Sequence, residues 1–251
     1  MGILKILVLV AVTLLPFSAQ AFEIKTMNEE ERSIFRSEVR AYLLENPQVL
    51  VEAMNVLENQ QQFAETQAEV QMLVENGQEL LNDGISFVGG NPDGDITMVE
   101  FLDYRCGYCR KAMEEVAELL KTDGNIRLIV KEYPILGEDS NVSSQMAIAT
   151  LQALGPSAYA ALHEELMVFN GPMNEKSIRL LAHRVGLDPD VILEQMKDPK
   201  VDEHIARMHE LGRKLQVSGT PTFVVGGAIV RGYVPLASMR QIVEEERAAI
   251  N

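Results

Sequence analysis

The chain has two cysteines, Cys106 and Cys109, and only two residues separate them. A pair at this spacing can work as a redox dithiol, supply part of a metal site, or form a structural crosslink. A crosslink is the weakest of these, because closing so short a loop removes little entropy from the unfolded chain. Structural zinc needs four ligands, and the nearest histidine in the sequence, His163, lies far downstream. Copper(I) prefers soft thiolates and stays open as an alternative to redox chemistry.

The residues around the pair favour a reactive thiol at Cys106. Segment 96–104 is rich in β-branched and aromatic residues and predicts a strand, and 108–121 predicts a helix with one apolar face. Cys106 would then lie at the first turn of the helix, where unpaired N–H groups and the helix dipole stabilise a thiolate. We expect Cys106 to be the exposed nucleophile and Cys109, tucked beneath it, to resolve the mixed disulfide. Three basic residues add local positive charge: Arg105, Arg110 and Lys111.

The first 21 residues have the composition of a secretory signal peptide. Lys5 gives a positive start, an apolar run follows at 6–15, and small residues precede the expected cleavage after Ala21. The apolar run is too short to span a bilayer with ease, so we prefer a cleaved signal to a membrane anchor. Export predicts a periplasmic protein whose cysteines meet an oxidising compartment. The net charge of −15 argues against a nucleic-acid partner, because phosphate contacts need lysine and arginine.

Residues 22–83 are expected to form an N-terminal helical extension. Apolar residues recur every three or four positions, Pro47 interrupts them, and 48–76 contains neither glycine nor proline. The second part is polar with a thin apolar seam, and such a helix is seldom stable alone in water. It is expected to dock either on the rest of the chain, as a surface helix, or on a second copy of itself.

The remaining residues, 84–251, predict an α/β domain. A turn-rich segment at 82–95 marks its start. The strand and helix around the cysteines are followed by a second strand at 126–134, and this order predicts a parallel βαβ unit.

An inserted helical subdomain is expected at about 139–216, because only helical patterns punctuated by glycine and proline occur there. A hairpin at 220–232 and a closing helix at 235–250 follow. The predicted order of the domain is therefore βαβ, helical insertion, ββα. The helices expected in the insertion are Val142–Leu154, Ser157–Phe169, Glu175–Val185, Pro189–Met196 and Val201–Leu215.

Two motifs, "FLDYRCGYCRKA" and then "TPTF" beyond the insertion, resemble the DsbA class of exported thiol:disulfide interchange proteins. The resemblance covers roughly residues 86–251 and implies a thioredoxin fold. It implies a redox-active disulfide between Cys106 and Cys109 and no other cofactor. It also implies that the peptide bond before Pro221 is cis and that Thr220 and Pro221 lie beside the cysteine pair.

Within this class, the chain most resembles the suppressor-of-copper-sensitivity C proteins and other members with a helical N-terminal extension, which include trimeric disulfide isomerases. The extension, with "AYLLENPQVLVEAM", is similar in character. The dipeptide Gly107-Tyr108 lacks the histidine that strongly oxidising members usually carry, so we expect a less oxidising pair. The residues expected to contact substrate are Gly107, Tyr108, Thr220 and Pro221.

Two charged residues lie within apolar strand segments, at positions that resemble a buried acid–base pair of the DsbA class. Glu100 precedes Cys106 by six positions, and Lys131 lies near the end of the next strand. A carboxylate near the cysteines could relay a proton when Cys109 attacks. The alternative is that one or both side chains point to solvent from a strand edge.

These observations predict an oligomeric protein disulfide isomerase or reductase. Its substrates would be unfolded or misoxidised exported proteins, and a membrane redox partner would keep Cys106 reduced. Self-association through the extension would arrange several catalytic domains around one substrate. Two alternatives stay open: a monomeric DsbA-like dithiol oxidase, and a copper(I)-binding or chaperone module.

Overall fold

The computed structural model of the chain describes residues 27–250, and the expected signal peptide at 1–21 lies outside the described residues. Contacts divide the chain into two units, one up to Gln61 and one from Gln62 onward. The division falls inside a helix rather than at residue 83, where the sequence places the end of the extension. Within the described part of the chain, no helix combines the length and apolar character needed to cross a membrane.

The described part of the extension contains helices α1 (Glu29–Glu45) and α2 (Gln48–Glu75), followed by the short helix α3 (Gly77–Leu81). Helix α1 begins with a capping box, in which Asn28 accepts a hydrogen bond from the Glu31 amide and Glu31 accepts one from the Asn28 amide. It ends before Pro47, because the residue preceding a proline disfavours helical geometry. The predicted interruption at Pro47 is confirmed.

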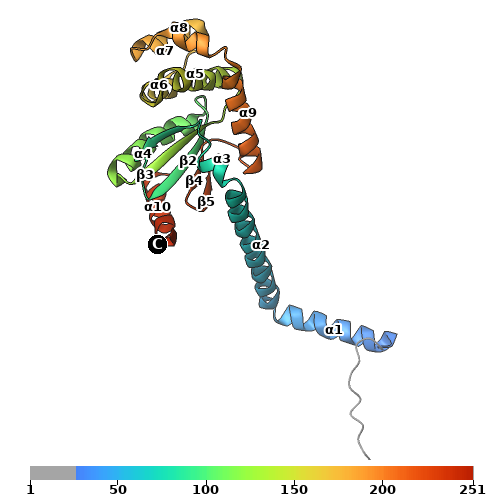
Figure 1. The fold of residues 1–251 in the computed structure, drawn as a ribbon. Coiled ribbons are helices and arrows are strands. Elements are labelled where there is room, and N and C mark those ends of the chain that lie inside the picture. Colours follow the sequence, from blue (N-terminus) through green and yellow to red (C-terminus); the bar gives the residue numbers. More distant parts are fainter. Residues whose placement is uncertain (1–26, 251) are drawn as a thin grey trace, which may run out of the picture. The chain divides into compact units, whose positions relative to one another are not determined.

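In the described part of the second unit, five strands form one mixed sheet in the order β1-β3-β2-β4-β5. Strands β2 and β3 are parallel, and the other neighbouring strands are antiparallel. Helix α4 (Gly107–Asp123) connects β2 to β3 (Figure 1). The predicted βαβ unit is therefore confirmed. The strands are β1 (Phe87–Gly90), β2 (Ile96–Leu102), β3 (Ile126–Glu132), β4 (Thr222–Val225) and β5 (Ala228–Arg231).

Strand β1 lies in the segment that the sequence marks only as a turn-rich boundary. It pairs with β3 from Phe87 opposite Val130 to Gly90 opposite Arg127. Two of its four residues are glycine, and glycine is depleted in strands, so the sequence pattern does not reveal it. Gly90 has a φ of 65°, and a Cβ atom there would overlap the carbonyl oxygen of Ile126. This position therefore requires glycine.

One face of the sheet carries the larger hydrophobic core. Met98 and Leu102 of β2 are buried in one cluster with Val116 of helix α4 and Met239 of helix α10 (Leu236–Ile250). The insertion helices complete this core, and Figure 1 shows α5 to α8 at one end of the sheet. The cysteine-bearing helix is thus held between the sheet and the insertion.

The opposite face of the sheet is covered by the C-terminal end of the extension. Leu73 of α2 and Leu80 of α3 (Gly77–Leu81) are buried in one cluster with Phe101 of β2. Leu211 of the insertion joins the same cluster. The end of α2 and all of α3 therefore belong to the core of the second unit, which is why the contact boundary lies upstream of residue 83.

The segment between β3 and β4 is helical, as the sequence predicts. Two of its helices begin with standard caps: Asp188 and Asp198 each accept a hydrogen bond from an amide two residues on, and a proline occupies the first helical position after each. A pattern of Asp-Pro before an apolar run is therefore a reliable start signal in this chain. The helices are α5 (Glu138–Leu154), α6 (Pro156–Val168), α7 (Glu175–Arg184), α8 (Pro189–Gln195) and α9 (Pro199–Lys214).

Candidate functional site

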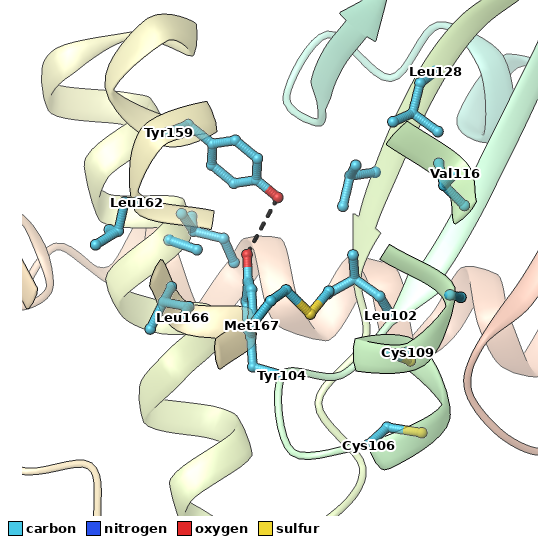
Figure 2. Packing of buried hydrophobic residues seen from close by; sticks show 14 of the residues in the cluster. Leu102, Tyr104, Cys106, Cys109, Val116, Leu128, Tyr159, Leu162, Leu166 and Met167 are labelled. Carbon is cyan, nitrogen blue, oxygen red and sulfur yellow. Dashed lines mark hydrogen bonds between the residues drawn. The ribbon is translucent and has the colours of Figure 1, made fainter. Parts of the chain in front are cut away.

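The two cysteines lie at the start of helix α4, directly after β2. Cys106 is the N-cap residue, and its carbonyl oxygen accepts from the Arg110 amide at 3.1 Å. Cys106 keeps 8% of its surface exposed, whereas Cys109, in the first turn, is fully buried (Figure 2). Burial raises the pKa of the Cys109 thiol well above its usual value. Cys106 is thus the more accessible of the two residues, but it is itself buried in this structure, so the expectation of an exposed nucleophile is not met.

The segment before β4 forms the other wall of the site. The Thr220–Pro221 peptide bond is cis, as the resemblance implies, and the Cys106 thiol donates to the Thr220 carbonyl oxygen at 3.0 Å. Strand β4 pairs antiparallel with β2, with Phe101 opposite Thr222. The start of β4 therefore meets the end of β2, and this pairing brings the two distant motifs together.

Two arginines beside the cysteines anchor the insertion to the site. Arg105 donates to the Phe169 carbonyl oxygen at 3.2 Å and pairs with Asp139 at 2.9 Å. Arg110 donates to the same Phe169 oxygen at 2.6 Å. The positive charge that the sequence places next to the pair is therefore fixed there by contacts with the insertion.

Asp103 is a structural residue of the site that the sequence analysis missed. It is fully buried, and its carboxylate accepts hydrogen bonds from the backbone amides of Arg105 at 2.7 Å, Ile135 at 2.8 Å and Leu136 at 3.0 Å. These bonds hold the loop after β3 against the loop that leads to Cys106. A signal existed, because an aspartate that directly follows a buried strand needs such partners.

The dipeptide between the cysteines faces outward. Tyr108 is 63% exposed, and its ring centroid lies 6.2 Å from that of Tyr233. The Lys111 ammonium lies 4.0 Å from the Tyr233 ring centroid. A Cβ atom added at Gly107 would meet no described atom within 4 Å. An open aromatic surface therefore adjoins Cys106.

Glu100 is buried beneath the cysteine pair. It is 4% exposed, and among the described residues its Oε1 atom has no hydrogen-bond partner. Burial, and then the charge of Glu132, raise the pKa of Glu100 to about 8. Besides burial, the Glu100 charge also raises the pKa of Cys109. A carboxyl that keeps its proton near neutral pH can give a proton to a neighbouring thiolate or take one from a thiol.

Lys131 does not pair with Glu100, so the prediction that these two residues form an acid–base pair is wrong. Glu100 lies opposite Val130 in the parallel register, and successive residues of a strand point to opposite faces. On the other face, Lys131 Nζ lies 2.8 Å from Asp83 Oδ2 and donates to the Glu79 carbonyl oxygen at 3.0 Å. The lysine therefore fixes the segment after α3 to the sheet.

A second buried carboxyl, Glu132, shares the face of Glu100 and was missed by the sequence analysis. Its Oε1 atom accepts from the hydroxyls of Tyr104 at 2.8 Å and Tyr159 at 2.6 Å, and its Oε2 atom accepts from Ser144 at 2.7 Å. Figure 2 shows the hydroxyls of Tyr104 and Tyr159 pointing toward one another in the core. Strand alternation was the available signal, because Glu132 lies two positions after the inward-facing Val130.

The groups immediately around the cysteines are those of thiol chemistry. Both cysteines are free thiols in this structure. Among residues 27–250, no three His, Cys, Asp or Glu side chains gather into a group that could hold a metal ion. A carbonyl oxygen, a helix N-terminus and a buried carboxyl form the setting of the pair.

Comparison with known families agrees with this setting. The DSBA-like thioredoxin domain family matches residues 97–244, and the chain belongs to this family. The mixed sheet with its helical insertion is accordingly a DsbA-like thioredoxin fold, as the sequence predicts. A second match, to the Copper resistance protein ScsC N-terminal domain, covers residues 31–64.

Solved structures with the same fold cover both units. A thioredoxin-like oxidoreductase from Silicibacter pomeroyi is 42% identical, with a TM-score of 0.64 over 68% of this chain and 97% of that one. Proteus mirabilis ScsC in a transitional conformation is 27% identical, with a TM-score of 0.65 over 90% of this chain and all of that one. The second similarity thus includes most of the extension.

Among curated proteins, a 141-residue region is 32% identical to Na(+)/H(+) antiporter NhaA 1 of Salinispora arenicola. The region represents 56% of this chain and 21% of the antiporter. The chain therefore spans about one fifth of that relative's length, and the similarity concerns only this part of the antiporter.

Proposed function

We propose that the chain is a periplasmic thiol–disulfide oxidoreductase that works through Cys106 and Cys109. The observation that carries the proposal is the position of the Cys106 thiol, at the N-terminus of α4 and 3.0 Å from the Thr220 carbonyl oxygen. A helix N-terminus stabilises a thiolate. The buried second thiol lies in the same turn, within reach of the first. Export is supported by the composition of residues 1–21.

The exchange begins when the Cys106 thiolate attacks a substrate disulfide. A new S–S bond forms to one substrate sulfur, and the other substrate sulfur leaves as a thiolate and takes up a proton. Cys109 then loses its proton and attacks Cys106, which forms the enzyme disulfide and releases the first substrate sulfur. Two electrons have passed from the dithiol to the substrate. If a substrate thiolate attacks the mixed disulfide first, Cys106 is released unchanged and the substrate disulfide is rearranged.

Replacing each cysteine separately tests this assignment. Cys106→Ser should lose all reduction of insulin disulfides, because no nucleophile remains at the accessible position. Cys109→Ser should instead accumulate a mixed disulfide with substrate, visible by mass spectrometry. Ser238→Ala, on the exposed side of α10, is the control and should match the parent. Activity retained in the Cys106→Ser protein would exclude the proposed mechanism.

We infer isomerase or reductase chemistry, with a self-associating extension. Within residues 29–45, all described, no side chain is buried. Many large apolar side chains exposed on one short segment favour an interaction site, and the match of residues 31–64 to the ScsC N-terminal domain supports the same assignment. The large apolar side chains exposed in the first unit are Ile34, Phe35, Val39, Tyr42, Leu44, Leu50, Val51, Met54, Val56 and Leu57.

The contact boundary defines the right truncation for testing self-association. Removing residues 22–61 leaves intact the part of the extension that buries Leu73 and Leu80. We expect this protein to be monomeric by light scattering, to reduce insulin as the parent does, and to lose activity on a scrambled disulfide substrate. Leu57→Glu should also weaken self-association, whereas Gln61→Glu, an exposed control on the same helix, should not. A truncated protein that keeps its oligomeric mass would contradict the proposal.

An isomerase needs Cys106 in the reduced state, so the proposal includes a membrane redox partner that supplies electrons. Its substrates are unfolded or misoxidised exported proteins. The thiol state of freshly exported protein, trapped with an alkylating reagent, tests the direction of electron flow. Mostly reduced cysteines are expected, and mostly oxidised cysteines would indicate a dithiol oxidase instead.

A further inference from the structure

Strand alternation places two carboxyls behind the cysteine pair on one face of the sheet. Glu100 lies opposite Val130, and Leu102 lies opposite Glu132, in the parallel register of β2 and β3. Glu100 and Glu132 are therefore diagonal neighbours on the same face, at a typical separation of roughly 7 Å. They are 4% and 2% exposed. Two carboxylates cannot both ionise easily in such a site.

The surroundings of the two carboxyls differ sharply. Glu132 accepts hydrogen bonds from three hydroxyls, those of Tyr104, Tyr159 and Ser144. For Glu100, the Oε1 atom is buried with no partner among the described residues. Hydrogen-bond donors stabilise a carboxylate, and burial without donors favours the neutral acid. Burial raises the pKa of Glu132 to about 7, although the three hydroxyls oppose this rise. That pKa lies below the value of about 8 for Glu100, so Glu132 is the first of the two carboxyls to ionise and Glu100 keeps its proton to a higher pH.

The proton positions around Glu132 are consistent with a carboxylate. When Glu132 is ionised, Tyr104 donates its one hydroxyl proton to it, and the His163 tautomer that carries a proton on Nδ1 can then donate to the Tyr104 oxygen at 3.0 Å. Burial lowers the pKa of His163 to about 4, so this imidazole is neutral near pH 7. The resulting chain runs from His163 through Tyr104 to Glu132.

The charged and titratable groups that face the two carboxyls are few. From α4, Cys109 acts on Glu100. Tyr104, after β2, and Tyr159, from α6, donate to Glu132, and His163 of α6 contacts Tyr104. Asp103, also after β2, acts on Glu132 by its charge. The lysine of the same strand, Lys131, points to the opposite face and pairs with Asp83. Within residues 27–250, the groups that act on the two carboxyls are thus hydroxyls, a thiol and other acids.

We propose that Glu132 is a positioning residue of the exchange reaction: its charge keeps on Glu100 the proton that Cys109 takes up when it leaves the Cys106–Cys109 disulfide. The inference rests on the proposed thiol exchange. A substrate thiolate forms an S–S bond to Cys106, the Cys106–Cys109 bond breaks, and Cys109 leaves with the electron pair. The Glu100 proton then moves to the Cys109 sulfur. In the reverse step the Glu100 carboxylate takes the same proton back.

This arrangement gives Glu100 an acidity that suits proton transfer to the Cys109 sulfur. A carboxyl with an ordinary pKa would be ionised at pH 7 and would have no proton to give. Burial, and then the charge of Glu132, raise the pKa of Glu100 to about 8, which brings the carboxyl closer to the thiol in basicity. Proton transfer is efficient in both directions when donor and acceptor have similar pKa values near the working pH.

Glu132→Gln tests the proposal, because it removes the charge and preserves the side-chain size. The rate at which a small thiol reduces the Cys106–Cys109 disulfide is measured against pH and corrected for the thiolate fraction of the reductant. The midpoint of the profile should move to lower pH by about one unit or more. A merely structural role would lower the rate at every pH and leave the midpoint in place.

The carboxyl titrations provide a readout that does not depend on thiol exchange. In protein labelled with ¹³C in the Glu carboxyls, the NMR titration midpoint of Glu100 should fall in Glu132→Gln. Because coupling between two sites is reciprocal, the midpoint of Glu132 should fall by a similar amount in Glu100→Gln. Tyr159→Phe, which removes one donor to Glu132, should lower the Glu100 midpoint by a smaller amount. Glu118→Gln, at an exposed position on α4, removes the same charge and should change neither midpoint.

The outcomes separate this inference from the proposed function. Unchanged Glu100 midpoints in folded Glu132→Gln and Tyr159→Phe would overturn the inference. If Glu132→Gln does not fold, Tyr159→Phe and the reciprocal titration in Glu100→Gln decide in its place. An unshifted rate profile alongside a shifted Glu100 titration would also overturn it, because Glu100 would then play no part in the exchange. A parent protein that exchanges no disulfides would instead refute the proposed function.

Discussion

The thiol of Cys106 lies 3.0 Å from the carbonyl oxygen of Thr220, although 114 positions separate the two residues in the chain. The contact depends on the pairing of β2 with β4, which brings the end of one strand to the start of the other. The helical insertion lies between the two residues in the chain, so the contact also requires that the insertion packs outside this junction. The pairing of the strands therefore creates the surface around Cys106. The reactivity of the thiol depends on the few side chains next to this junction.

The exposed position 108 should control how strongly the thiolate is stabilised. Tyr108→His places a cationic hydrogen-bond donor next to Cys106, so the reduced form should be favoured in equilibrium with glutathione by about tenfold. Tyr108→Phe keeps the aromatic ring without such a donor and should behave as the parent does. Equal equilibrium constants for the His and Phe variants would show that residue 108 does not act on the thiol.

Breaking the buried ion pair between Lys131 and Asp83 by removing one charge should be strongly destabilising. Their side chains are 0% and 5% exposed, so Asp83→Asn leaves a buried ammonium without its counter-charge. We expect a loss of roughly 3 kcal/mol in the free energy of unfolding, measured in urea. Glu194→Gln, which breaks the exposed pair with Lys197, is the control and should have little effect.

The same ion pair should define an acid limit of stability. Burial opposes ionisation of Asp83, but hydrogen bonds from Lys131 and Ser86 outweigh it and lower the pKa of Asp83 from 3.8 to about 2. The folded pKa lies below the unfolded one, so this contribution is present above pH 3.8 and is lost as the pH falls toward 2. Unfolding free energies measured across this window should fall in the parent and fall less in Asp83→Asn. Parallel curves would contradict the expectation.

Glu100 should have the opposite effect on the pH dependence of stability, at higher pH. Its pKa is raised from 4.5 to about 8, through burial and the charge of Glu132. The folded pKa lies above the unfolded one, so its contribution to stability is present below pH 4.5 and is lost as the pH rises toward 8. The free energy of unfolding in urea should fall over this pH range in the parent protein. It should fall less in Glu100→Gln, which should be the more stable of the two proteins at pH 8. Glu118→Gln should follow the parent, and the same decline in Glu100→Gln would contradict the expectation.

Close packing at Gly212 should make this position intolerant of any side chain. A Cβ atom there would overlap the ring of Tyr133, whose hydroxyl donates to the Val217 carbonyl oxygen at 3.2 Å. Gly212→Ala should therefore cost about 1–3 kcal/mol of unfolding free energy. Gly77→Ala is the matched control, because a Cβ atom at Gly77 meets no described atom within 4 Å. It should be neutral or slightly stabilising, and equal losses in both variants would show that Tyr133 can move aside.

Much of the fold could be predicted because its signals are local. The apolar strands, the Asp-Pro helix starts and the glycine pair of the hairpin at 226–227 each leave a pattern in a few neighbouring residues. Strand β1 escaped prediction because Gly89 and Gly90 give it the composition of a turn. The order of the strands required the resemblance, because composition does not specify which strands pair.

The candidate site was predictable only in part, for a geometric reason. Glu100 and Lys131 were expected to pair because their positions resemble a buried acid–base pair of the DsbA class, but the parallel register puts them on opposite faces. Applying the same alternation to β3 would have pointed to Glu132. Its partners could not have been found in this way, because Tyr159 and Ser144 reach it only through the tertiary packing of the insertion.

Glu132 lies on the thioredoxin sheet, whereas two of its three hydrogen-bond donors, Ser144 and Tyr159, come from helices α5 and α6 of the insertion. If the insertion were exchanged between related proteins, or removed to make a minimal redox domain, Glu132 would remain buried in an apolar core without these two hydrogen-bond donors. Any such graft has to carry the strand residue and its helical donors together. Glu132, Ser144 and Tyr159 therefore depend on one another, although the sequence divides them between the sheet and the insertion.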